Sequence, residues 1–114
     1  NTDDDYVCKN CGYKDKLIAL FRGKYLCLDD PKNISKPFNG NYIEGALLSG
    51  IPYVLGDTLV ILNRCTGVIE LLDISDEYNP KFIKRIKTSG YPEACSVINE
   101  EIYVAMGFGG ILKI

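Results

Sequence analysis

The chain has 114 residues, a formal net charge of −2 and a hydrophobic content of 46%, as expected for one globular domain with a modest core. Its pI is about 5.1 and its lysines and arginines are scattered, so the basic stripe of a nucleic-acid binder is missing and we expect no nucleic-acid partner. The sequence contains no histidine, which excludes a histidine-based catalytic triad and removes the commonest neutral metal ligand.

The chain opens with a polar, acidic stretch, residues 1–5, that has nothing to bury and is predicted to be a disordered leader. This stretch resembles the tether that follows the lipid-modified cysteine of bacterial surface lipoproteins. The resemblance implies export and a possible lipid anchor upstream of Asn1. No run of eighteen or more apolar residues occurs, so no membrane span is predicted, and residues 6–114 are expected to form a single domain.

The first third of the domain reads as a turn, a hairpin and a loop. Residues 6–16 contain a CxxCG pattern that predicts a tight Cys-Gly turn. Residues 17–21 and 24–28 are short apolar runs that predict two strands of a tight hairpin. Residues 29–41 are rich in proline and asparagine and predict a loop with at most a short edge strand near Phe38.

The rest of the chain predicts short strands separated by Gly, Pro, Asn and Asp turns. The predicted strands are residues 46–55, bent or bulged at Ser49 and Gly50, and residues 58–62, 68–74, 81–86 and 94–98. The strand at 81–86 carries lysines and an arginine, as an exposed outer strand does. Apolar residues come in short runs and not at helical spacing, so the sequence predicts an all-β fold of roughly ten strands.

An internal repeat organises these strands. Residues 54–71 align without a gap with residues 97–114, at an offset of 43, which places Val54 on Val97, Gly67 on Gly110 and Val68 on Ile111. Short strands and turns with such a period are typical of β-propeller blades. A fainter copy begins near residue 17, which gives repeats at 17–45, 46–88 and 89–114.

The fold predicted from the repeat is therefore a set of propeller-like blades of about four antiparallel strands, roughly 2.5 blades in all. A small β-barrel or sandwich is the alternative. An incomplete set of blades leaves apolar faces and strand edges uncovered. We expect either several chains to complete one ring or this chain to be one piece of a longer protein.

The second half of the chain resembles the LVIVD-repeat family of β-propeller-like surface proteins. The resemblance covers mainly residues 46–114 and is carried by Asp73-Ile74-Ser75, Asn79-Pro80, Ala94, Ile102-Tyr103-Val104-Ala105 and Gly109-Gly110-Ile111-Leu112. It implies a scaffold or binding role at a bacterial cell surface or in a secreted protein, and it supplies no catalytic residues.

Cys8 and Cys11, followed by Gly12, resemble half of a zinc-ribbon or rubredoxin knuckle. Two thiolates at this spacing can hold one tetrahedral zinc or iron, and the glycine lets backbone amides approach the sulfurs. The second pair of close ligands is missing from the sequence. We therefore expect no cofactor, with zinc or iron at Cys8 and Cys11 as the alternative.

The five cysteines also allow a disulfide framework or plain thiols, and their odd number leaves at least one unpaired within the chain. Cys27 and Cys65 lie in or beside predicted strands and fit small apolar core residues. A thioredoxin-like motif is disfavoured, because no helix is predicted after Cys11.

Acidic and glycine-rich loops give two further candidates. Asp29, Asp30, Asp73, Asp76 and Glu77 could hold calcium or serve a hydrolase, although solvated turn carboxylates are the simpler interpretation. The glycine-rich residues 107–110 join two predicted strands and not a strand and a helix, so they predict a hairpin turn and not a phosphate site.

The sequence thus predicts a non-enzymatic, exported or cell-surface β-repeat module that binds a protein or ligand, or assembles with copies of itself. The first alternative is a small metal-binding or redox protein working through Cys8 and Cys11. The second is a hydrolase that uses the acidic loop residues.

Overall fold

The computed structural model describes residues 8–30 and 39–114, and this part of the chain is all-β, as predicted. Its ten strands are β1 (Cys8–Tyr13), β2 (Lys16–Phe21), β3 (Lys24–Leu28), β4 (Ile51–Leu55), β5 (Thr58–Leu62), β6 (Val68–Asp73), β7 (Lys81–Lys87), β8 (Ala94–Ile98), β9 (Glu101–Ala105) and β10 (Ile111–Lys113). A single 3₁₀ turn, η3 (Gly107–Gly109), precedes β10.

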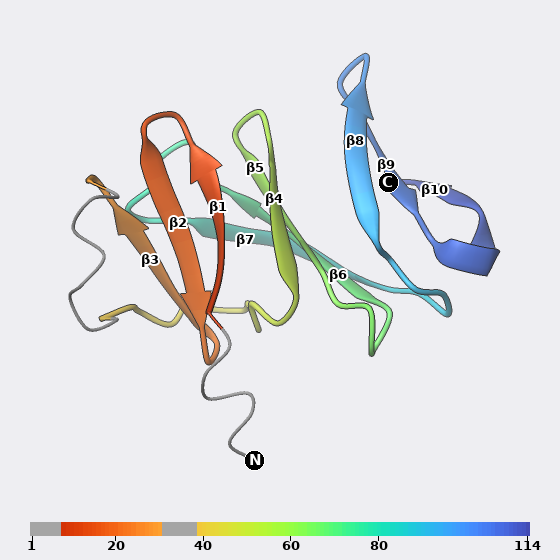
Figure 1. Ribbon diagram of the computed structural model, residues 1–114, viewed down its shortest axis with the longest axis horizontal. Helices are drawn as coiled ribbons and strands as arrows, with labels where there is room; N and C mark the ends of the chain where they lie inside the picture. Colours follow the sequence, from red (N-terminus) through yellow and green to blue (C-terminus); the bar gives the residue numbers. More distant parts are fainter. Residues whose placement is uncertain (1–7, 31–38) are drawn as a thin grey trace.

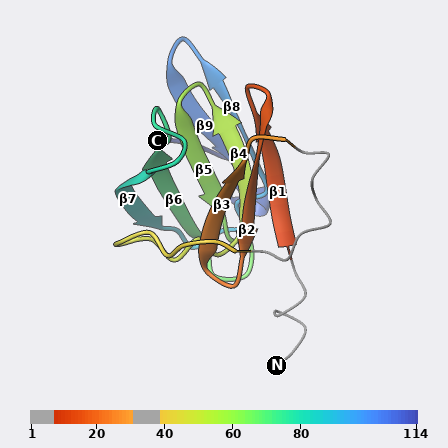
Figure 2. The ribbon, with the colours of Figure 1, turned by 90° about the vertical axis from the view of Figure 1, so that its left-hand side faces the viewer.

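The strands form three antiparallel sheets in which each strand pairs with its neighbours in the sequence. We name them the N-terminal sheet (β1-β2-β3), the central sheet (β4-β5-β6-β7) and the C-terminal sheet (β8-β9-β10). Figure 1 shows the three sheets in chain order, and Figure 2 views the stack from the side of the N-terminal sheet. No closed barrel forms from the described strands.

The central sheet buries apolar side chains on both of its faces, because alternate residues of a strand point to opposite sides. Leu59, Ile61 and Leu72 face the N-terminal sheet, and Val60, Leu62, Ile69 and Leu71 face the C-terminal sheet. The N-terminal sheet contributes Tyr13, Ile18, Leu20 and Tyr25 to the first core, and the C-terminal sheet contributes Val104 and Met106 to the second. The fold is therefore a stack with two separate cores.

The same two-residue hairpin joins the first two strands of every sheet. The turns pair Tyr13 with Lys16, Leu55 with Thr58 and Ile98 with Glu101. The first strands begin at residues 8, 51 and 94, and their hairpins lie 42 residues apart between the first two sheets and 43 between the last two. The predicted repeat is thus a repeat of sheets, and the first copy begins at β1 instead of residue 17.

The first correction concerns the alignment of the two clear copies. Leu62 pairs with Ile69, whereas its counterpart Ala105 pairs with Ile111, so Ile111 matches Ile69 and not Val68. The loop before β10 is one residue shorter than the loop before β6. Met106 donates the closing hydrogen bond to the carbonyl of Gly110, four residues later, whereas Asn63 donates to the carbonyl of Val68, five residues later. The gapless alignment holds through β9 and slips by one position in β10.

The second correction concerns the predicted bent strand. Residues 46–48 lie outside any strand, and β4 begins only at Ile51. Leu48 adopts a φ of 57°, and Gly50 adopts a φ of 140° close to the backbone of Leu62. These positive φ values end the extended conformation that an apolar run suggests.

Tyrosine hydroxyl groups tie neighbouring sheets together. Tyr13 in β1 donates a 2.6 Å hydrogen bond to Asp57 in the first turn of the central sheet. Tyr53 in β4 donates a 2.9 Å hydrogen bond to the carbonyl of Glu93, just before β8. The first bond reaches the β4–β5 hairpin of the central sheet, and the second reaches the segment that enters β8.

Of the loop predicted at residues 29–41, only residues 29, 30 and 39–41 are described. Asn41 pairs with Tyr25 through two backbone hydrogen bonds, whereas Phe38 and the leader 1–5 lie outside the described residues. The described part of the chain holds no helix with the length and apolarity that crossing a membrane requires.

Candidate functional site

The predicted Cys-Gly turn is a strand. Cys8 and Cys11 both belong to β1, where Cys8 pairs with Phe21 and Cys11 with Ile18. The tight turn falls later, at Lys14, which has a φ of 55°. The backbone of residues 8–13 is therefore extended and not turned as the knuckle pattern predicted. Zinc or iron at these cysteines stays a prediction.

Cys11 and Cys27 flank Ile18 on the inner face of the N-terminal sheet and pack against the first core. Burial raises the pKa of Cys11 to about 11, so the group is a neutral thiol at physiological pH. Cys95 packs against the second core, and burial likewise raises its pKa to about 11. Of the cysteines whose side chains are described, Cys11, Cys27, Cys65 and Cys95 are free. The partial burial of Cys11, Cys27 and Cys95 is typical of small apolar core residues. Cys65 is exposed, so the prediction that it is a core residue is wrong.

The acidic loop residues that the sequence analysis singled out make hydrogen bonds and ion pairs within the protein. Asp73 accepts a hydrogen bond from the amide of Ser75, which lowers the pKa of its carboxyl group. Asp76 binds the amide of Tyr78, and the Tyr78 hydroxyl donates to Asp29, which raises the tyrosine's pKa.

Glu77 forms a 3.2 Å ion pair with Lys16. Within residues 8–30 and 39–114, no three His, Cys, Asp or Glu side chains are placed to hold one metal ion. The hydrolase alternative stays a prediction.

Glycines 107–110 form the turn between β9 and β10, as predicted. Gly107 and Gly110 have φ values of 63° and 80°, and the amide of Gly109 donates to the carbonyl of Met106. Glycine adopts positive φ values without steric cost, which explains why Gly107 and Gly110 occupy these positions of the turn. Phe108, at the tip of this turn, is wholly exposed to solvent.

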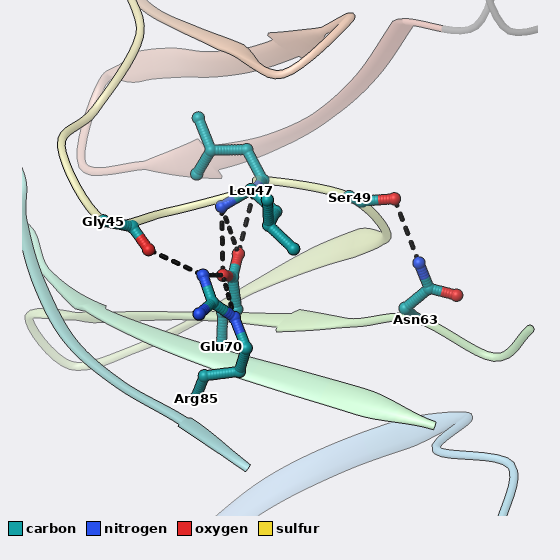
Figure 3. A network of polar contacts seen from close by, with 7 residues as sticks. Gly45, Leu47, Ser49, Asn63, Glu70 and Arg85 are labelled. Atoms are coloured by element: carbon teal, nitrogen blue, oxygen red, sulfur yellow. Dashed lines mark hydrogen bonds and ion pairs between the residues drawn. The ribbon is translucent and has the colours of Figure 1, made fainter. Parts of the chain in front are cut away.

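A buried acidic residue that the sequence analysis did not single out organises the junction between two sheets. Glu70 in β6 is 2% exposed and accepts hydrogen bonds from Arg85 in β7 and from the amides of Leu47 and Leu48 (Figure 3). Arg85 also donates a 2.6 Å bond to the carbonyl of Gly45. The network anchors residues 45–48, which lead from the N-terminal sheet into β4. A glutamate inside the apolar run VIELLD was the available signal.

The basic outer strand is an edge of the central sheet among the described strands, as predicted. Its residues are not equivalent, because Arg85 turns inward to Glu70 whereas Lys84 is exposed. Lys87 donates a hydrogen bond to the carbonyl of Thr66 and so fastens the end of β7 to the loop before β6.

The outer face of the C-terminal sheet is exposed at positions where the other two sheets are buried. When the sheets are matched on their first hairpins, Ile111 takes the place of Ile69 and Tyr25. Ile69 and Tyr25 are 0% and 3% exposed, whereas Ile111 is 69% exposed. Ile98 matches Tyr13 by the same criterion and is 57% exposed, against 5% for Tyr13. We call the surface formed by Ile98, Tyr103, Ala105 and Ile111 the open face.

Comparison with known protein families finds no family model that matches this chain, and comparison with curated proteins finds no match either. The LVIVD resemblance therefore stays a prediction. The open face remains the candidate site that the repeat itself identifies, because equivalent residues in the two preceding sheets are covered by a following sheet.

Proposed function

We propose that the chain is a non-enzymatic β-repeat module of propeller type, which assembles with copies of itself by stacking its open face on another sheet. The observation that carries this proposal is the positional match between exposed residues of the C-terminal sheet and buried residues of the other two sheets. Exposed apolar side chains are typical of interaction sites, and on this face they lie beside the ion pair between Glu101 and Lys113.

The N-terminal sheet of a second copy has the chemistry to cover the open face. Its outer face carries Leu17, Ala19, Leu26 and Leu28, which match the positions of Leu59, Ile61, Glu70 and Leu72 in the central sheet. The three leucines are half-buried and Ala19 is 4% exposed. Three of those four central-sheet residues form the core against the N-terminal sheet. A head-to-tail contact between copies would therefore repeat the two sheet-to-sheet contacts within the chain.

A head-to-tail contact closes into a ring when the rotation between copies allows it. Two copies would supply six sheets, which lies within the four to eight blades of known propellers, whereas three copies would supply nine. We therefore propose a dimer. The exported or cell-surface location remains a prediction from the leader and from the LVIVD resemblance.

Solution mass tests this proposal. Light scattering during size-exclusion chromatography should give twice the 12.7 kDa of one chain for the wild type. Ile111→Asp should give a folded monomer, because it places a charge in the centre of the interface. Ile83→Asp is the matched control, since Ile83 is 50% exposed on β7 and away from the open face. A folded wild-type monomer at high concentration would refute the proposal.

A further inference from the structure

A pocket lies at the junction of the central and C-terminal sheets, where the turn between β5 and β6, the segment that enters β8 and the turn between β9 and β10 come together. The pocket has a volume of about 470 Å³ and is lined by Arg64, Tyr91, Glu93, Gly107 and Phe108. Its volume falls within the range of small-molecule sites, which combine aromatic surface with a few polar groups. The pocket is therefore a candidate site for a small ligand.

Hydrogen bonds fix the segments that carry these residues. The amide of Glu93 donates to the carbonyl of Ala105 at 2.9 Å, and the carbonyl of Glu93 accepts from the Tyr53 hydroxyl at 2.9 Å. The side-chain oxygen of Asn63 accepts from the two backbone amides that follow Arg64, which shapes the turn that carries this arginine. The backbone around the pocket is thus held in place by contacts within the protein.

Phe108 is exposed because it lies at the tip of a turn. At the offset of 43 it matches Cys65, at the tip of the turn between β5 and β6. The strand β6 has β7 beside it, and Cys65 is exposed all the same. The glycines of the Phe108 turn supply its positive φ values, so the conformation of this turn does not require an aromatic residue. Tyr91, which is 59% exposed, lines the same pocket, and two exposed aromatic rings at one pocket are typical of a binding site.

Arg64 and Glu93 place one charge of each sign at the pocket. Nη2 of Arg64 lies 3.3 Å from Oε1 of Glu93, and the two side chains are 57% and 45% exposed. So exposed an ion pair contributes little to the stability of a fold. The other carboxylate oxygen lies 3.5 Å from the position that a Cβ would take at Gly107, and Tyr91 lies 3.7 Å from the same position. One oxygen of Glu93 is therefore paired with Arg64, and the other lies near Gly107 and Tyr91.

We propose that this pocket binds a phosphocholine group, a zwitterion in which a phosphodiester and a quaternary ammonium are a few atoms apart. A ligand with a single charge would meet one attractive and one repulsive side chain at short range, whereas a zwitterion can oppose both. Arg64 binds the phosphate oxygens. Glu93 and the rings of Tyr91 and Phe108 receive the ammonium, because aromatic rings attract quaternary ammonium ions.

The pocket shares no residue with the open face, so this inference and the proposed dimer can fail separately. The probe is glycerophosphocholine, added to isotope-labelled wild-type protein and followed by nuclear magnetic resonance. The amides of Glu93, Gly107 and Phe108 should show saturable shifts. Choline lacks the phosphate and glycerophosphoethanolamine lacks the methyl groups, so each should bind at least about threefold more weakly.

Variants of the lining residues test each half of the site. Phe108→Ala and Tyr91→Ala should each weaken binding about threefold, because each removes one ring from around the ammonium. Tyr42→Ala is their control, since Tyr42 is exposed and lies outside the pocket. Arg64→Gln should weaken binding about threefold through the phosphate, whereas Lys84→Gln, which removes an exposed positive charge outside the pocket, should not. All of these side chains are exposed, so the variants should stay folded, which circular dichroism checks.

Vesicles of phosphatidylcholine distinguish two sources of the phosphocholine group. Sedimentation of the wild type with these vesicles, reduced by Phe108→Ala, would assign a lipid head group, and binding of glycerophosphocholine alone would assign a soluble ester. Both results support the proposal. It is overturned if glycerophosphocholine causes no saturable shifts at the pocket, if Phe108→Ala and Arg64→Gln bind it as the wild type does, or if choline, glycerophosphoethanolamine or methyl glucoside binds equally well.

Discussion

Arg85 donates two hydrogen bonds to a single carboxylate oxygen of Glu70, one from Nε at 2.9 Å and one from Nη2 at 2.6 Å. The other carboxylate oxygen accepts from the amide of Leu48 at 2.8 Å, and the amide of Leu47 donates to both oxygens, at 3.1 and 3.0 Å. A charge in so buried a position is tolerated because every acceptor site has a donor. The pair therefore sets how the chain enters the central sheet.

Removing Arg85 should destabilise the protein strongly. Arg85→Met leaves the Glu70 carboxylate buried without its cation, and we expect the free energy of unfolding to fall by about 3 kcal/mol. Glu70→Gln should cost less, about 1–2 kcal/mol, because the amide oxygen still accepts from the backbone and the partly exposed Arg85 can be hydrated.

Urea denaturation followed by circular dichroism measures both losses. Lys84→Met is the control, since it removes a neighbouring positive charge that is exposed, and it should change stability by no more than about 0.5 kcal/mol. Equal effects of Arg85→Met and Lys84→Met would show that the network does not stabilise the fold.

Gly67 should not accept a side chain. It has a φ of 77°, and a Cβ there would lie 2.4 Å from the carbonyl oxygen of Thr88. We expect Gly67→Ala to lower the free energy of unfolding by at least about 2 kcal/mol. Gly12→Ala is the matched control, because nothing lies within 4 Å of its Cβ position and β1 is extended there. It should be neutral or stabilising by up to about 1 kcal/mol. Loss of stability on Gly12→Ala would contradict the assignment of β1 as a regular strand.

The sequence was sufficient to predict elements specified by local patterns. Thr58–Leu62 and Lys24–Leu28 have the predicted bounds, because short apolar runs end at turn residues with positive φ, such as Gly23 and Gly56. The offset of 43 also predicted that the sheets repeat. These features depend on neighbours in the sequence.

Elements that depend on distant partners were not predictable in the same way. Residues 8–13 are polar and lack a strand pattern, and β1 exists through its pairing with β2. Residues 46–48 read as a strand until their amides are seen to bind Glu70. The one-residue slip in β10 hid the match between Ile111 and Ile69, which identifies the open face.

Buried thiols should make the protein less stable at alkaline pH. Burial raises the pKa of Cys11 and of Cys95 from 9.0 to about 11. Between these values the unfolded chain loses thiol protons that the folded chain keeps, so the free energy of unfolding falls as pH rises.

Denaturation of the wild type and of a Cys11→Ala, Cys95→Ala double variant at about pH 8 and about pH 10.5 isolates this effect, because lysines and tyrosines titrate in both proteins. The wild type should lose more stability than the double variant over this range. Equal losses would show that these thiols titrate alike in the folded and unfolded chains.

The open face should also determine how much apolar dye the protein binds. If Ile98 and Ile111 are covered only by a second copy, the Ile111→Asp monomer should bind an apolar dye through Ile98 and Tyr103 more than the wild-type dimer does. Adding Ile98→Asp to this variant should reduce the dye signal, which fluorescence titration measures. Equal dye binding by all three proteins would mean that this face stays uncovered in the wild type.

The most direct test of the central claim is the solution mass of the wild-type chain by light scattering across a range of concentrations. Head-to-tail stacking of the open face predicts a closed dimer of twice 12.7 kDa that does not grow further as concentration rises. A folded, stable monomer at every concentration would contradict the claim.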